Sequence, residues 1–100
     1  MLATPPMPET QARQLAKRGY YCTYLSAEPG HEQRDAIHET DTVIVPIEGE
    51  VELVFKGATH FPRPGREIHV PAWTAHTVRN IGDVTAVWLR GLEAVRAHTD

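Results

Sequence analysis

The sequence predicts one all-β domain, a sandwich or a closed barrel, preceded by a short helix. Segments rich in β-branched and aromatic residues recur about eight residues apart, which is typical of sandwiches and barrels. Glycine and proline, which favour turns, separate these segments. Only one stretch, near the N-terminus, has apolar residues at helical spacing, and the 100 residues of the chain fit one compact domain.

Residues 1–19 are interpreted as an N-terminal extension. "TPPMPE" contains too much proline for a helix or a central strand, so we expect an extended lead-in there. "ETQARQLAKRG" predicts one short helix that Thr10 caps and Gly19 ends. Its apolar residues lie at helical spacing, namely Ala12, Leu15 and Ala16. The β-rich barrel domain is expected to occupy residues 20–95.

The β-rich part begins with "YYCTYLSAE", a strand that ends at the turn signal Pro29-Gly30. "TVIVPIEGEVELVF" predicts two strands joined at Gly49. In the second of these, apolar and acidic residues alternate, so one face is expected to be buried and the other exposed to water. The buried set is then Val51, Leu53 and Phe55, and the exposed set is Glu50 and Glu52.

The first strand of that pair is apolar on both faces, because Val43, Ile44, Val45 and Ile47 do not alternate with polar residues. Such a strand is covered on both sides. We expect the domain core to cover one face and a second subunit the other, which predicts a homodimer. A domain this small also gains stability from association. Pro46 cannot donate a hydrogen bond to a neighbouring strand, so it predicts a local break or a sheet edge.

Four more segments predict short strands: "KGATHF", "REIHVP", "AHTVRN" and "VTAVWLRG". In the third, His76, Val78 and Asn80 share one face. Trp88 in the last segment is expected to pack in the core, whereas Trp73, in the turn before His76, could cover or plug the mouth of a pocket. The final residues, "LEAVRAHTD", are compatible with a last helical turn.

Composition and charge argue against several classes of protein. The formal net charge is -3, and no basic run or aromatic-basic stripe favours nucleic-acid binding. No apolar segment approaches the length of a membrane span, and "MLATPPMPET" lacks the features of a signal peptide. We therefore expect a cytoplasmic protein with no membrane partner. Cys22 is the only cysteine, so it cannot form an intrachain disulfide and is expected to be a small buried residue.

Two spaced motifs in the middle of the chain carry the strongest functional signal. The first consists of Gly30, "HEQRD", Ala36-Ile37-His38, "ETD", Thr42, "VIVPIE" and Gly49. The second consists of Gly65, "REIHV", Pro71-Ala72-Trp73, "TA", His76, "TVR" and Asn80. Fifteen residues separate the two motifs.

These motifs resemble the two motifs of the cupin family. The family's first motif is Gly, five residues, His-x-His, three residues, Glu, six residues and Gly. Its second is Gly, five residues, Pro-x-Gly, two residues, His, three residues and Asn. This chain keeps every spacing from Gly30 to Asn80. The resemblance implies a double-stranded β-helix, the conical jelly-roll barrel of cupins, with a small-molecule site inside it.

The departures from the family pattern concern its metal site. In the family, two histidines and a glutamate from the first motif, with one histidine from the second, hold a divalent metal. The resemblance therefore implies His38 and His76 as metal ligands, whereas Ala36 and Thr42 occupy the positions of a histidine and the glutamate. Trp73 replaces the glycine of the second motif. Imidazole and carboxylate donors suit zinc, iron, nickel or manganese.

His69 is a further candidate ligand, since metal sites usually have three or four protein ligands. If it points inward, it could complete a cluster with His38 and His76. Alternation along its strand favours the opposite orientation, because a surface-facing His69 lets Ile68 and Val70 be buried.

The neighbours of His38 in the first motif are expected to face solvent. An inward His38 on a regular strand leaves its neighbours of opposite parity pointing outward, namely Asp35, Ile37 and Glu39. Three further histidines lie near turns or at the end of the chain and are expected to be exposed, namely His31, His60 and His98.

Two functions of different classes remain open. One is a metal-dependent enzyme for a small polar or aromatic compound, in which His38 and His76 bind the metal and water or substrate fills the other positions. The other is a metal-free binding or sensing module, in which Ala36 and Thr42 widen and neutralise the pocket. The loss of two ligands favours the second, and the surviving pair of histidines keeps the first open. Both predict a small-molecule ligand in the barrel.

Overall fold

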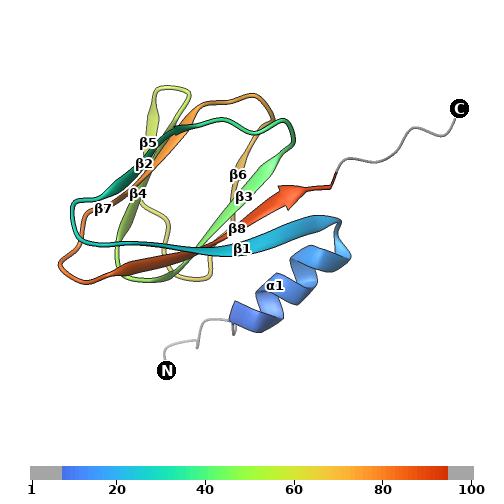
Figure 1. Cartoon of the computed structure of the whole chain (residues 1–100), viewed down its shortest axis with the longest axis horizontal. Coiled ribbons are helices and arrows are strands. Elements are labelled where there is room, and N and C mark those ends of the chain that lie inside the picture. Colours follow the sequence, from blue (N-terminus) through green and yellow to red (C-terminus); the bar gives the residue numbers. More distant parts are fainter. Residues whose placement is uncertain (1–7, 95–100) are drawn as a thin grey trace, which may run out of the picture.

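The computed structural model describes residues 8–94 as two four-stranded sheets with one helix packed outside them (Figure 1). Helix α1 comes first and eight strands follow it. The bounds are α1 Pro8–Lys17, β1 Tyr20–Ala27, β2 Glu32–Ala36, β3 Thr42–Glu48, β4 Val51–Phe55, β5 Ala58–His60, β6 Ile68–Val70, β7 His76–Asn80 and β8 Ala86–Glu93.

Each sheet draws strands from both halves of the chain. One sheet has the order β1-β8-β3-β6 and the other has the order β2-β7-β4-β5. All pairings are antiparallel. Most successive strands therefore enter opposite sheets, and the chain winds around a common interior. This arrangement confirms the predicted all-β jelly-roll barrel with a short N-terminal helix.

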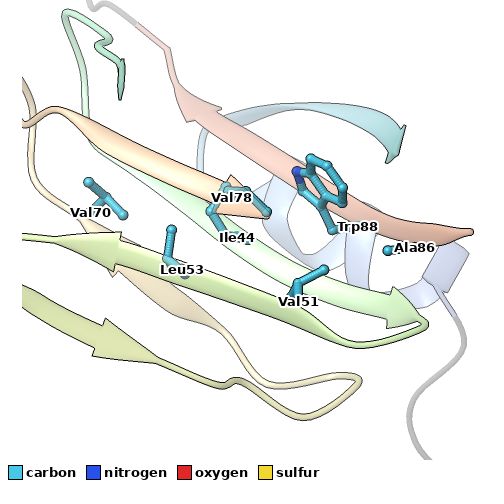
Figure 2. Close-up of a cluster of buried hydrophobic side chains, with 7 residues drawn as sticks. All are labelled: Ile44, Val51, Leu53, Val70, Val78, Ala86 and Trp88. Carbon is cyan, nitrogen blue, oxygen red and sulfur yellow. The ribbon is translucent and has the colours of Figure 1, made fainter. Parts of the chain in front are cut away.

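The space between the sheets is filled by a cluster of apolar side chains, here called the interior cluster. Figure 2 shows them pointing into that space: Ile44, Val51, Leu53, Val70, Val78, Ala86 and Trp88. Phe55 packs against the cluster, so the inward set predicted for β4 is confirmed. Glu50 is exposed as predicted. Glu52 is only partly exposed, because it lies opposite Arg79 on the neighbouring strand β7.

A second apolar cluster explains why β3 is apolar on both faces. Val43 and Val45 lie on the outer face of their sheet and pack with Leu89 of β8 and Leu15 of α1. Helix α1 packs against β1 and β8 and closes this face (Figure 1). The cover that we expected from a second subunit is thus provided within the chain. The homodimer stays a prediction, without the argument from β3.

The helix begins earlier than the sequence analysis predicted. Pro8 is its first residue, so Thr10 lies inside the helix and the prediction that Thr10 caps it is wrong. Proline suits the first helical position, where a backbone N–H has no partner within the helix. The predicted end is confirmed, because Gly19 adopts a φ of 93° beyond Lys17. Within residues 8–94, no helix is long and apolar enough to cross a membrane.

Two other boundaries differ from the prediction. The segment Glu32–Ala36 forms strand β2, although every residue before Ala36 is polar and the segment lacks a strand pattern. At the other end of the chain, Leu92 and Glu93 belong to β8, so a last helical turn there is wrong as far as the described residues extend. The rest of that predicted turn, from residue 95, lies outside the described residues, as does most of the lead-in "TPPMPE".

Pro46 occupies the break that the sequence predicted. The pairing of β3 with β6 ends at Ile44, so β3 is a sheet edge on that side at Pro46. The register with β8 also shifts between Pro46 and Glu48. The proline therefore stands where its missing N–H costs no hydrogen bond to β6.

Candidate functional site

His76 opens strand β7 and points into the barrel. Its side chain shares a face with Val78, a member of the interior cluster, and the residue is 2% exposed. Its Nδ1 lies 3.2 Å from the carbonyl oxygen of Thr74. A carbonyl only accepts hydrogen bonds, so Nδ1 carries the hydrogen and Nε2 of the neutral ring is left as an acceptor. The turn before β7 therefore fixes the orientation of the ring.

His38 lies in the loop between β2 and β3, not within a strand. Two hydrogen bonds tie this loop to the turn before β7: Trp73 N–H donates to the His38 carbonyl at 2.8 Å, and Ala72 N–H donates to Asp41 Oδ1 at 2.8 Å. The two imidazole rings are 5.6 Å apart between centroids and tilted by 46°. The structure thus brings together the two histidines that the motifs predicted.

The Nε2 atoms of both histidines are buried and have no hydrogen-bond partner among the described residues. Most buried polar atoms in proteins are paired, since an unpaired one loses its hydration without compensation. Two unpaired ring nitrogens on adjacent side chains are therefore a feature that a bound ligand would explain.

The two substituted motif positions face the same region. Ala36 is the direct partner of His76 in the β2–β7 pairing, so its side chain lies on the inner face of that sheet. Thr42 is 1% exposed and shares its face with Ile44 of the interior cluster. Small or neutral side chains thus stand where the family pattern has a histidine and a glutamate.

Arg90, a residue that the sequence did not single out, places a positive charge near His38. Burial lowers the pKa of His38 below its ordinary value of 6.5, and the positive charge of Arg90 and the ring of His76 lower it further. Arg90 belongs to β8 and shares a face with Trp88. The alternation in "VTAVWLRG" contained this signal, since a core position for Trp88 places Arg90 on the same face.

The donor set does not fit a tightly held divalent metal. His38 and His76 offer two neutral nitrogens, and residues 8–94 contain no group of three His, Cys, Asp or Glu side chains placed to hold a metal ion. Structural and catalytic metal sites use three or four protein ligands. The neighbouring guanidinium of Arg90 also repels a cation. Among the described residues, the unpaired Nε2 atoms of His38 and His76 are the one feature that favours a metal ion. Two nitrogen ligands alone do not complete a metal site.

The structure does not bring His69 to this pair. His69 pairs with Val43, which lies on the outer face, and its side chain is 53% exposed. Its Nε2 lies 3.2 Å from Oε1 of Glu67. Ile68 packs against the interior cluster and Val70 belongs to it, as the alternation favoured.

The other expected exposed residues divide into two groups. Four are exposed as predicted, namely His31, Asp35, Ile37 and Glu39. His60 departs from the prediction, because it is partly buried and stacks on Phe55 with ring centroids 4.9 Å apart.

Trp88 is in the core as predicted, whereas Trp73 is 70% exposed in the turn that holds the His38 loop. His98 lies outside the described residues.

Comparison with known proteins identifies the family. A family model described as a cupin domain matches residues 23–90. No curated protein matches the chain.

Three solved structures show the same fold. A cupin superfamily protein from Desulfitobacterium hafniense is 19% identical with a TM-score of 0.68, over 74% of this chain and 66% of that one. A predicted oxalate decarboxylase from Thermotoga maritima is 14% identical with a TM-score of 0.69, over 83% and 74%. The cupin domain of an XRE family transcriptional regulator from Enterobacter cloacae is 18% identical with a TM-score of 0.71, over 81% and 87%.

The chain spans just under two thirds of the Desulfitobacterium protein, at 66% of its length. At these identities the three structures show the fold alone. The family match covers more than half of the chain and agrees with both motifs and with the jelly-roll topology. The chain belongs to the cupin family.

Proposed function

We propose that this protein binds a small molecule inside its barrel, beside His38 and His76, without a tightly held metal ion. The observation that carries this proposal is the pair of buried, unpaired Nε2 atoms on two rings held 5.6 Å apart. A ligand with hydrogen-bonding groups would satisfy both nitrogens. Ala36 and Thr42 are smaller than the histidine and the glutamate of the family motif and bring neither a charge nor a metal-binding group.

A non-enzymatic role agrees with one of the structural relatives. The Enterobacter protein with a TM-score of 0.71 is the cupin domain of a transcriptional regulator, and this chain covers 87% of it. A small cupin barrel can thus belong to a regulatory protein. The Thermotoga relative is a predicted oxalate decarboxylase, so an enzymatic role is the alternative for this chain.

The experiment is a fragment screen read at the imidazole C–H resonances in NMR spectra of the untagged protein. Bound fragments are expected to shift the His38 and His76 signals in a saturable manner. His69, which is exposed on the outer face, is the internal control and should not shift. Fragments that move only the His69 or His31 signals, or none of them, would contradict a binding site in the barrel.

A second arm of this experiment separates the metal-free module from the metal-dependent enzyme. Chelator-treated protein is titrated with zinc and with nickel, and binding is measured by calorimetry. We expect weak binding only, because two imidazoles beside a cation form an incomplete ligand set. Stoichiometric tight binding that His76→Ala abolishes and His69→Ala does not would support the metal-dependent alternative instead.

A further inference from the structure

Arg90 is directed into the barrel from the middle of the sheet β1-β8-β3-β6. On β8, Ala86 and Trp88 belong to the interior cluster, whereas Leu89 belongs to the outer one. Alternation therefore places Arg90 on the inner face. Its direct partner on β3 is Ile44, another member of the interior cluster. The guanidinium thus emerges beside the packed core, and Arg90 affects the pKa of His38 from there.

Arg90 has no acidic partner among the residues that the structure describes. Within residues 8–94, no carboxylate lies within ion-pair distance of Arg90; the ion pairs formed there involve Arg18, Arg34 and His69. The position at which the cupin motif has a glutamate is Thr42. The buried Nε of Arg90 has no hydrogen-bond partner in this part of the chain. Arg90 as a whole is half-buried, and an anionic ligand that reached its guanidinium would form a charge-assisted hydrogen bond that the described residues do not supply.

Nearby polar atoms restrict the ligand further. Nε2 of neutral His76 is an acceptor, because its Nδ1 donates to the Thr74 carbonyl. Nε1 of Trp88, which shares the inner face of β8 with Arg90, is a buried donor that has no partner within residues 8–94. The site therefore offers a cation and an N–H donor to an anion, and an acceptor to a hydroxyl group.

We propose that the ligand is a small hydroxycarboxylate, whose carboxylate is bound by Arg90 and whose hydroxyl donates to Nε2 of His76. The planar guanidinium matches the two oxygens of a carboxylate. This proposal rests on the proposed function, since it assigns a ligand class to the same barrel site.

Three matched probes test the ligand class at constant ionic strength. Lactate has both the carboxylate and the hydroxyl, propionate lacks the hydroxyl, and lactamide lacks the charge. Binding is read from the ring resonances of His38 and His76, as in the fragment screen. We expect lactate to bind most tightly, propionate more weakly, and lactamide at least about ten-fold more weakly than lactate, since a hydrogen bond to a charged group contributes about ten-fold or more.

Variants of Arg90 test which residue recognises the anion. Arg90→Met keeps a long apolar side chain and removes the charge, and we expect it to weaken lactate binding about 10-fold to 100-fold while leaving lactamide binding unchanged. Arg90→Lys keeps the charge but lacks the planar guanidinium. Its affinity for lactate should lie between those of Arg90→Met and the unmodified protein. The matched control is Arg34→Met, because Arg34 is an exposed arginine with 74% of its side chain accessible. It should bind lactate like the unmodified protein.

Thermal melting gives a second readout, which does not rely on the ring resonances of His38 and His76. Without ligand, Arg90→Met is expected to melt at a higher temperature than the unmodified protein, because it replaces a half-buried charge that has no carboxylate partner within residues 8–94 by an apolar side chain. Saturating lactate should raise the melting temperature of the unmodified protein only, since it binds that folded state.

The outcomes distinguish this proposal from the proposed function. Equal affinity for lactate and lactamide, or full lactate binding by Arg90→Met, overturns the hydroxycarboxylate and leaves barrel binding intact. Propionate that binds as tightly as lactate overturns the role of the hydroxyl. If no probe and no library fragment shifts the His38 and His76 signals, both proposals are overturned.

Discussion

His38 stays neutral near neutral pH because its surroundings oppose a positive charge. Burial lowers its pKa from the ordinary value of 6.5, and Arg90 and His76 lower it further. Well above pH 6.5 this ring is neutral in both the folded and the unfolded chain, so its titration does not change the stability there. As the pH falls below 6.5, the unfolded chain binds a proton that the folded chain does not, and the free energy of unfolding decreases.

We therefore predict that an NMR titration places the pKa of His38 below 6.5 in the folded protein. Arg90→Met should move this pKa upward, because it removes one of the opposing charges, whereas Arg34→Met should leave it unchanged. Unfolding titrations at several pH values should show stability declining below pH 6.5. A pKa of His38 at or above the ordinary value would mean that the ring is not held as the structure shows.

Gly49 is a motif residue whose role is steric. It has a φ of 77°, and a Cβ built there would lie 2.9 Å from the Cα of Ala86. Gly30, the first glycine of the same motif, has a similar φ of 81°, and no atom of the described residues lies within 4 Å of its Cβ position. Alanine at Gly30 should therefore cause backbone strain alone, whereas alanine at Gly49 should cause the same strain and a steric clash.

We predict that Gly30→Ala lowers the free energy of unfolding by about 1–2 kcal/mol, the cost of a side chain in the left-handed region. Gly49→Ala should cost about 1–3 kcal/mol more, because Ala86 or its strand must move. Denaturant unfolding followed by circular dichroism measures both values. Equal losses in the two variants would show that β8 does not approach Gly49 so closely.

At the scale of elements, helix α1 completes the fold by covering the outer face of the sheet β1-β8-β3-β6. Leu15 is 1% exposed and packs with Val43, Val45 and Leu89. Leu15→Ala is expected to lower the free energy of unfolding by about 2–5 kcal/mol, because it opens a cavity under the helix. Arg13→Ala, on the exposed side of α1, should change it by less than about 0.5 kcal/mol. Similar losses in the two variants would mean that the helix does not stabilise the barrel.

The elements also show how far the sequence predicts this fold. Alternation predicted the inward face of β4, and turn residues placed most strand ends, because both signals are local. Strand β2 escaped prediction because its residues are polar and only its pairing with β7 makes it a strand. The two apolar faces of β3 indicated that both faces are packed against other parts of a protein. No local pattern shows whether α1 or another subunit packs on the outer face.

The candidate site could also be predicted only in part. His38 and His76 could be predicted because the spacing of the motifs preserves their positions in the barrel. Arg90 lies outside both motifs, and its relation to His38 depends on the pairing of β8 between β1 and β3, which only the folded chain establishes. The electrostatic character of the site was therefore not available from the motifs.

At the scale of the whole molecule, the four motif positions come from both sheets and from the loop between β2 and β3. Ala36 is opposite His76, and Thr42 faces the interior from β3. If these side chains converge around one point with His38, restoring the family residues should restore a metal site. Ala36→His with Thr42→Glu supplies three imidazoles and one carboxylate, a set that suits zinc or nickel.

We predict that zinc or nickel raises the melting temperature of this double variant after chelator treatment, and that the unmodified protein shows little change. At a metal concentration of about 100 times Kd, the free energy of unfolding should rise by about 2.7 kcal/mol, because the metal binds only the folded state. Without metal the variant should be less stable than the unmodified protein, since Thr42 is 1% exposed and a glutamate there overfills its site.

Arg90 provides the internal control for this last prediction. Its charge repels a metal ion and pairs with the new glutamate, so Arg90→Met added to the double variant should increase metal affinity further. The same substitution removes the proposed anion partner, so the triple variant should bind metal and lose lactate. A folded double variant that metal does not stabilise would show that the four positions do not converge. Metal that stabilises the unmodified protein equally would show that His38 and His76 already recruit other donors, and the metal-free function would then be wrong.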